Sequence, residues 1–208
     1  AEGSLGAQVP RVIEEIKEAA SGKVKISVAI GDLPNLPGTA ALAALGAAAL
    51  GADYVKAGLY GVHREIDAVN LLAELKEAVR PFGSSVVAAG YADFRRAGTL
   101  GPDCLLRAAA AAGARACLLD TAVKDGRGLF DFINPRKLAL MAGQAHAAGL
   151  LFGLAGALRE QDLPVARNLG ADVVGLRTAA CRDNRRSGPL EAARVRRLAD
   201  SAKFSAKV

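Results

Sequence analysis

Residues 113–128, GARACLLDTAVKDGRG, contain in succession a glycine turn, a short apolar run and a polar loop with a lysine. The pattern of a glycine, an alanine or leucine and then a strand recurs as GADYV (51–55), GLLFGL (149–154) and GADVVGL (170–176). A glycine that ends a helix just before a strand is typical of the short connection in a repeated βα unit. Such repetition, with right-handed crossovers, favours either a barrel or an open doubly wound sheet.

Apolar runs alternate with amphipathic or alanine-rich segments along the whole chain, which predicts parallel strands covered by helices. The expected strands are 25–30, 53–58, 85–90, 115–120, 150–154 and 172–176. The expected helices are 10–20, 39–50, 65–79, 103–112, 135–148, 161–169 and 189–202. Pro10, Pro135 and Pro189 lie near expected helix starts, where the missing N–H group costs nothing.

The loops after the strands decide between the two architectures. The first strand leads into GDLPNLPG (31–38), where a dinucleotide-binding fold would carry G-x-G-x-x-G, and no Walker A loop occurs. Polar residues and glycines follow every expected strand instead, which favours a (β/α)8 TIM barrel of the α/β class. We count six strands, so we expect residues 1–208 to form one barrel domain with strands three to eight, and the first strand, first helix and second strand to be missing. Two missing strands would leave open sheet edges, so we expect the chain as written to aggregate when expressed alone.

Composition limits the class of partner. Hydrophobic residues make up 51% and aromatic residues 4% of the chain, which suits close packing of helices on a sheet. The net charge of +6 favours anionic partners. Because Lys and Arg are spread over the helices and form no stripe, we expect a small phosphorylated ligand and no nucleic acid.

The three cysteines, Cys104, Cys117 and Cys181, form no C-x-x-C or Cys/His metal spacing, which indicates a reducing compartment. The most apolar long stretch, 39–52, is shorter than a membrane span, and no signal peptide pattern occurs at the start of the given sequence. We therefore expect a cytoplasmic protein with no membrane partner, and we expect self-association as a homo-oligomer.

Two of the expected strands run out onto a lysine: Lys56 in DYVKAGLYG (53–61), and Lys124 four residues after Asp120. An amine at the end of an apolar strand is poorly solvated, so its neutral form is accessible for imine formation or proton abstraction. Asp120 is costly in such a place unless it is paired, and either lysine could pair with it. We predict Lys56, Asp120 and Lys124 as catalytic residues; a lysine snorkelling to solvent and a structural ion pair are the alternatives.

Further candidates for substrate binding follow the other strands. Asp32, Tyr91 and Asp93 either contact substrate or satisfy the loops and helix ends beside them. The last two strands lead into GLAGAL (153–158) and GLRTAAC (175–181), where small residues expose backbone N–H groups, as in many phosphate-binding barrels. The candidate phosphate ligands are Ala155, Gly156, Gly175, Arg177 and Thr178. The nearby arginines Arg182, Arg185 and Arg186 are either a solvated loop or a second phosphate contact.

The segments EGSLGA, GDLPNLPGT, ADYVKAGLYG, VVAAGYAD, LLDTAVKDGRGLFDF, GLAGAL and DVVGLRTAAC together resemble the (5-formylfuran-3-yl)methyl phosphate synthase family over essentially the whole chain. The resemblance implies a (β/α)8 barrel with lysine chemistry similar to that of class I aldolases. It implies a carbon–oxygen lyase acting on phosphates. This enzyme condenses two molecules of glyceraldehyde 3-phosphate, with loss of phosphate and water, toward the furan of methanofuran or methylofuran.

By position, Lys56 matches the family's strand-four lysine, a proton acceptor, and Asp120 and Lys124 match its strand-six acid and assisting lysine. The family's Schiff-base lysine lies just before EGSLGA, upstream of Ala1. Because the imine already serves as the electron sink, no metal or other cofactor is expected. Two other functions remain open: a non-catalytic phosphate-binding barrel that serves as a scaffold, and another class I aldolase or isomerase of sugar phosphates.

Overall fold

The computed structural model describes residues 5–34 and 36–202. Its six strands form one parallel sheet in the order β1-β2-β3-β4-β5-β6, so each strand pairs with the next along the chain. The strands are β1 (Ser27–Asp32), β2 (Tyr54–Gly58), β3 (Ser85–Tyr91), β4 (Ala116–Asp120), β5 (Leu151–Leu154) and β6 (Val173–Val174). A doubly wound sheet would reverse its strand order at a switch point, and this sheet does not.

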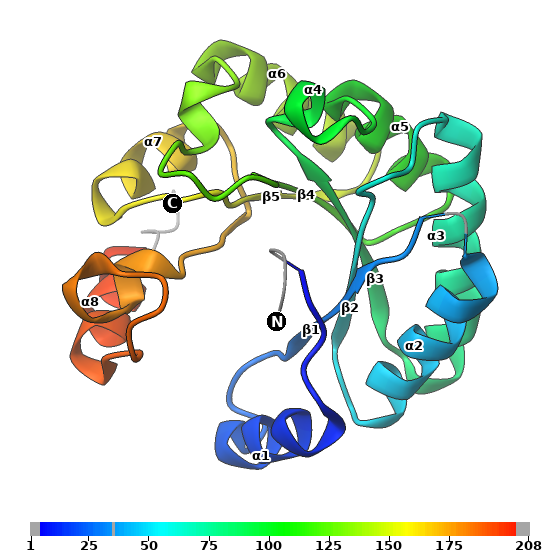
Figure 1. The fold of residues 1–208 in the computed structure, drawn as a ribbon, viewed down its shortest axis with the longest axis horizontal. Helices are drawn as coiled ribbons and strands as arrows, with labels where there is room; N and C mark the ends of the chain where they lie inside the picture. Colours follow the sequence, from blue (N-terminus) through cyan, green and yellow to red (C-terminus); the bar gives the residue numbers. More distant parts are fainter. Residues whose placement is uncertain (1–4, 35, 203–208) are drawn as a thin grey trace.

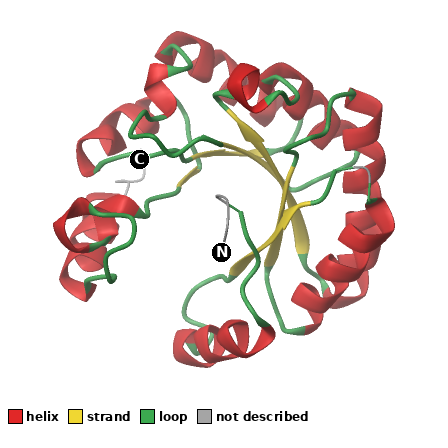
Figure 2. Cartoon of the chain, viewed as in Figure 1, coloured by secondary structure: helices red, strands yellow, loops and turns green. Residues whose placement is uncertain are grey.

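Helices cover the outer face of the sheet, and the strands curve into an arc inside them (Figure 1, Figure 2). The helices are α1 (Pro10–Ala20), α2 (Pro37–Ala49), α3 (Glu65–Val79), α4 (Phe94–Ala97), α5 (Pro102–Ala111), α6 (Pro135–Ala147), α7 (Leu163–Asn168) and α8 (Ala192–Ala202). Short 3₁₀ turns are η1 (Arg80–Phe82), η2 (Leu129–Asp131), η3 (Glu160–Asp162), η4 (Thr178–Ala180) and η5 (Arg182–Asn184). Within the described ranges, none of the helices combines the length and apolar character that a bilayer crossing requires.

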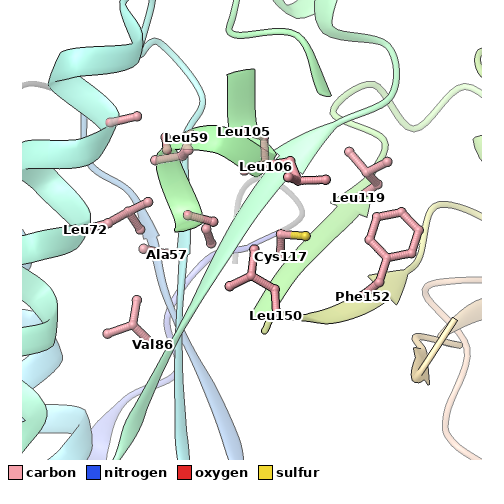
Figure 3. Close-up of a cluster of buried hydrophobic side chains, with 14 of the residues drawn as sticks. Ala57, Leu59, Leu72, Val86, Leu105, Leu106, Cys117, Leu119, Leu150 and Phe152 are labelled. Carbon is pink, nitrogen blue, oxygen red and sulfur yellow. The ribbon is translucent and has the colours of Figure 1, made fainter. Parts of the chain in front are cut away.

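The main hydrophobic core lies between the sheet and the helices. Leu72 of α3 and Leu105 of α5 pack there with Val86, Cys117 and Phe152 of the strands (Figure 3). The parallel strands are apolar on both faces, because helices cover one face and the other lines the interior of the arc.

A smaller cluster fills the inner face of the arc. Ala89, Tyr91, Leu118 and Ala155 point inward from the strands and loops and pack around Leu5 from the segment before α1. In a TIM-type (β/α) barrel, alternate strand residues fill the interior in this way, so the centre is a packed core and not a pore. The predicted TIM-barrel class is confirmed.

Residues 5–34 and 36–202 provide no strand that pairs with the outer edges of β1 and β6. The division of the chain into one barrel domain carrying strands three to eight stays a prediction.

The glycine turns of the repeated βα unit form as predicted. Gly51, Gly113, Gly149 and Gly170 end their helices with φ angles of 85°, 66°, 73° and 87°. These angles lie in the left-handed region, which glycine enters without the steric cost that a Cβ atom imposes. Each turn brings the chain directly back into the sheet, so the polar loops collect at the opposite end of the strands.

The observed elements differ from the prediction in several places. The last helix begins at Ala192 and not at Pro189, because the Pro189 carbonyl accepts from Arg182 N at 3.0 Å in a loop-to-loop contact. The predicted strand 172–176 is limited to β6, and single hydrogen bonds extend its pairing with β5 on either side: Asp172 N to Phe152 O and Gly175 N to Leu154 O, each at 2.8 Å. The short helix α4 has no counterpart among the predicted elements.

Candidate active site

A cleft of about 1670 Å³ opens at the carboxyl end of the strands. It brings together eight of the eleven predicted site residues: Lys56, Asp120, Lys124, Ala155, Gly156, Gly175, Arg177 and Thr178. Because these residues come from four strands, or the loops after them, that are far apart in the sequence, their convergence is a property of the fold. The carboxyl end of the strands is where barrel enzymes place their active sites.

Lys56 lies in the middle of β2, between Ala29 of β1 and Val87 of β3 in the register. Its side chain reaches the cleft, and no hydrogen bond or ion pair joins its amine to another described residue. Burial lowers the pKa of Lys56 below its ordinary value; the positive charge of Lys124 lowers it further, and the negative charge of Asp120 opposes both. Lys56 therefore carries an amine whose neutral form is unusually accessible.

Asp120 and Lys124 form a partly buried ion pair at the end of β4. Lys124 Nζ lies 2.7 Å from Asp120 Oδ1, and the two side chains are 25% and 13% exposed. Thr121 completes the arrangement: its N–H donates to Asp120 Oδ1 at 2.7 Å, and its hydroxyl accepts from Lys124 Nζ at 3.0 Å. Both hydrogen bonds that Asp120 accepts end on Oδ1, which leaves Oδ2 without a hydrogen bond from a described residue.

The loop after β5 closes against the loop after β4. Gly156 has a φ of 101°, and a Cβ atom there would lie 3.0 Å from Thr121 Cγ2 and 3.1 Å from Thr121 N. Gly156 O accepts from Leu129 N at 2.9 Å, which ties the loop to η2. The glycine therefore allows a close approach that fixes one wall of the cleft beside Asp120.

Gly156→Ala is expected to lower the free energy of unfolding by about 1–3 kcal/mol, because the new Cβ meets backbone atoms and φ stays positive. Urea unfolding followed by circular dichroism measures this loss. The matched control is Gly143→Ala in α6, where nothing lies within 4 Å of the new Cβ. That helical site should gain up to about 1 kcal/mol. Equal stability of the Gly156→Ala variant and the wild type would contradict the close approach.

The lining of the cleft is strongly basic. Its described lining contains nine basic side chains, Lys56, Lys124, Arg127, Arg159, Arg177, Arg185, Arg186, Arg194 and Arg197. The acidic lining residues are Asp120 and Glu160. Arg127, Arg194 and Arg197 are held by Asp125, Glu191 and Glu160 at 3.0, 2.8 and 3.0 Å.

Four of these guanidinium groups, those of Arg159, Arg177, Arg185 and Arg186, have no ion pair with a described residue. Arg177 and Thr178 lie at the start of η4, two and three residues after Gly175. The N–H groups of Ala155 and Gly175 are already bonded, to Leu119 O at 2.7 Å and Leu154 O at 2.8 Å. The unpaired guanidinium groups are therefore what favours an anionic ligand such as a phosphate ester.

Asp32, Tyr91 and Asp93 are not part of the cleft lining in the described residues. Asp32 Oδ1 accepts from the Tyr91 hydroxyl at 2.6 Å and from Tyr60 N at 3.0 Å. The rings of Tyr60 and Tyr91 pack edge to face with centroids 6.0 Å apart. Asp32 therefore buttresses the loop after β2, next to the site.

Asp93 is buried, with only 2% of its surface exposed. Its carboxylate accepts from Ala122 N at 2.7 Å and from Val123 N at 3.0 Å. Contact between Asp93 and a substrate, one of the two roles expected from the sequence, is therefore blocked in this structure. The carboxylate does not cap α4 either.

Sequence reasoning missed several residues that line or support the cleft, among them Thr121, Arg127 and Arg159. Thr121 was detectable in principle, because a hydroxyl directly follows the strand-end acid. Arg159 comes from the turn before η3 and gives no local signal, since only the path of the chain brings it to the cleft. In residues 5–34 and 36–202, no group of three or more His, Cys, Asp and Glu side chains is arranged to hold a metal ion.

Solved structures with the same fold include phosphate-handling barrels. 3-Hexulose-6-phosphate synthase superposes with a TM-score of 0.59 at 19% identity, over 92% of this chain and 80% of that one. Orotidine 5'-phosphate decarboxylase from Pyrococcus horikoshii superposes with a TM-score of 0.61 at 16% identity, over 94% and 81% of the two chains. Identities this low establish the shared barrel fold alone.

Sequence comparison is more specific. Residues 1–199 match the family model described as 4-HFC-P synthase. A protein of Methanopyrus kandleri named (5-formylfuran-3-yl)methyl phosphate synthase is 47% identical over 203 residues, which cover 96% of this chain and 86% of the relative. Its namesake from Methanocaldococcus jannaschii is 42% identical over 205 residues, which cover 97% and 87%. The resemblance noted in the sequence is thereby confirmed: this chain belongs to the 4-HFC-P synthase family.

Proposed function

We propose that this protein is a lysine-dependent synthase that joins two molecules of glyceraldehyde 3-phosphate into (5-formylfuran-3-yl)methyl phosphate. One new carbon–carbon bond forms, and one phosphate and water leave. The observation that carries the proposal is the meeting of Lys56, Asp120 and Lys124 in one strongly basic cleft. The name shared by the relatives supports the product, and the unpaired arginines support substrates that carry phosphate.

Lys56 is the proton carrier in this proposal. The first triose phosphate is held as an imine on the lysine that the family pattern places upstream of Ala1, and loss of a proton from carbon converts the imine to an enamine. A base for that step must be neutral near physiological pH and must not be held by a carboxylate. Burial favours the first requirement, because it lowers the pKa of Lys56, and the second is met, because Lys56 forms no ion pair with a described residue.

Asp120 and Lys124 act on the second triose phosphate. The enamine carbon attacks its aldehyde, and the oxygen that becomes an alkoxide needs a proton or a positive charge. The Lys124 ammonium, fixed by Asp120 and Thr121, supplies that charge, and the free Oδ2 of Asp120 can accept a proton during ring closure and dehydration. The phosphate then leaves by elimination, when a carbon–oxygen bond breaks and its electron pair departs with the phosphate.

The glycine loops and the arginines hold the phosphate groups. Gly156, Gly175, Arg177 and Thr178 line the cleft together with Asp120, and they form one phosphate-binding wall in this proposal, with Arg177 and Thr178 as the donors. A bidentate guanidinium contact fixes the orientation of a phosphate as well as its position. Two triose phosphates carry two phosphates, which agrees with a basic lining that extends beyond this wall to Arg185 and Arg186.

Borohydride trapping tests the imine and its location. The full-length protein is incubated with glyceraldehyde 3-phosphate, reduced with borohydride, digested and mapped by mass spectrometry. We expect one modified lysine that is neither Lys56 nor Lys124, since both have other roles. Incubation with borohydride but without substrate is the control. A stable adduct on Lys56 would reassign it as the nucleophile, and the absence of any adduct would contradict an imine mechanism.

A further inference from the structure

We propose that Asp93 is a positioning residue whose buried carboxylate fixes the loop that presents Lys124 to the cleft. This role rests on the proposed function, because it acts through Lys124. Asp93, which follows β3, would thus affect the reaction by positioning Lys124, without itself contacting the substrate.

The carboxylate of Asp93 bridges two neighbouring loops. Asp93 directly precedes α4, yet both of its side-chain oxygens bond across to the loop after β4: Oδ1 to Ala122 N and Oδ2 to Val123 N. These two amides lie between Asp120 and Lys124 in the chain. The side chain thus holds, by two hydrogen bonds, the segment between Asp120 and Lys124, the two members of the proposed catalytic ion pair.

The contact is unusual for a strand-end aspartate. Such a residue commonly caps the helix that follows it with its side chain. Here the backbone carbonyl of Asp93 accepts from the helix N–H groups instead, from Arg96 N at 2.8 Å and Ala97 N at 3.1 Å. A carboxylate that is removed from water is costly unless its charge is hydrogen-bonded. The amides of Ala122 and Val123 supply these hydrogen bonds, so they fix the loop after β4 at a defined position against Asp93.

A second set of contacts holds the other end of the same loop. Arg96 Nη2 lies 2.8 Å from Asp125 Oδ2 and its Nη1 lies 4.0 Å from Asp93 Oδ2. The guanidinium groups of Arg96 and Arg127 both lie over the ring of Phe132, at 5.5 and 5.2 Å from its centroid. Cation–π contacts and the shared Asp125 thus anchor residues 125–127.

Lys124 lies between these two anchors, in a segment without regular helix or strand. A four-carbon side chain on a free loop would sample solvent, and it would lose rotational freedom each time it returned to the substrate. With its backbone fixed on both sides, Lys124 keeps its amine at 2.7 Å from Asp120 and 3.0 Å from Thr121. Because a shift of about 1 Å in a reacting group can cost about 10²-fold in rate, the anchoring affects turnover directly.

A double-mutant cycle on the full-length protein tests the role of Asp93. The variants are Asp93→Asn, Lys124→Ala and the double variant, each assayed for kcat and KM with glyceraldehyde 3-phosphate. We expect Asp93→Asn to lower kcat about 10- to 100-fold with KM changed less than about threefold. The double variant should be no slower than Lys124→Ala alone, because Asp93 acts only through Lys124.

Hydrogen exchange of the wild type and Asp93→Asn supplies a readout independent of turnover, and exchange at residues 121–124 should accelerate at least tenfold. The matched control is Asp103→Asn, which removes an exposed carboxylate paired with Lys137 and should leave exchange and kcat unchanged. Should Asp93→Asn fail to fold, Arg96→Gln weakens the same loop from its exposed side and should show the same pattern with a smaller loss.

The outcomes separate the two hypotheses. Faster exchange with wild-type kcat in Asp93→Asn, while Lys124→Ala is slow, would overturn the positioning role and leave the proposed function intact. Losses in the double variant that multiply those of the single variants would also overturn it. Wild-type turnover in Lys124→Ala would instead remove the role of Lys124, and the role of Asp93 with it.

Discussion

Lys56→Ala is expected to lower kcat by about 10²–10⁴-fold while the protein stays folded, because general base catalysis by a positioned side chain contributes about that much. Lys56 is partly buried in β2, its pKa is lowered by burial, and no described carboxylate holds its amine in an ion pair. The residue is flanked by Ala29 and Val87 in the register, so a small side chain at this position adds no charge or steric conflict to the sheet. The assay follows the consumption of glyceraldehyde 3-phosphate by the full-length protein.

The control for this substitution is Lys137→Ala on α6. Lys137 is exposed and paired with Asp103, well outside the cleft lining, so its loss should leave kcat unchanged. Thermal unfolding of both variants shows whether the fold is intact. Near-normal turnover of a folded Lys56→Ala variant would contradict the proton-carrier role.

Asp120→Asn is expected to lower kcat by about 10²-fold or more and to shift the pH dependence of the remaining activity. Below its own pKa, Lys56 is protonated and cannot act as a base, so kcat/KM falls on the acid side of the profile. The negative charge of Asp120 raises the pKa of Lys56, against the lowering by burial. Its removal should therefore move the acid limb of the profile to lower pH.

Lys124→Met gives the opposite shift and is the matched comparison. The positive charge of Lys124 lowers the pKa of Lys56, so its removal should move the acid limb to higher pH. The measurement is kcat/KM across the pH range for the wild type and both variants, since this profile reports ionisations of the free enzyme. Shifts in the same direction, or no shift in either variant, would show that Lys56 does not set the acid limb.

Local sequence pattern was sufficient to predict the barrel. The glycine turns at Gly51, Gly113, Gly149 and Gly170 depend on backbone freedom at single positions, and each is visible beside its apolar strand. Parallel strands in sequential order bring their carboxyl ends to one side, so the convergence of Lys56 with Asp120 follows from the pattern alone. The pattern left the partner of Asp120 open between Lys56 and Lys124, and the structure pairs it with Lys124, four residues along the chain.

Contacts between segments that are distant in the sequence could not be predicted from the local sequence pattern. The Tyr91 hydroxyl and Asp32 are 59 residues apart, and the amides that occupy Asp93 belong to another loop 29 and 30 residues away. The local sequence around an acidic residue at the end of a strand is the same whether its carboxylate contacts a substrate or hydrogen-bonds to a neighbouring loop. Pro189 was misassigned for a similar reason, since its carbonyl pairs with Arg182 and does not start a helix.

The central claim, synthesis of a furan phosphate from two triose phosphates, is tested most directly by the product. The full-length protein is incubated with uniformly ¹³C-labelled glyceraldehyde 3-phosphate, and the products are separated and identified by mass spectrometry and NMR. We predict one product with six labelled carbons, one phosphate and furan proton resonances, together with free inorganic phosphate. A six-carbon product that keeps both phosphates would indicate an ordinary aldolase, and recovery of unchanged substrate would indicate a binding protein; either result would contradict the proposed function.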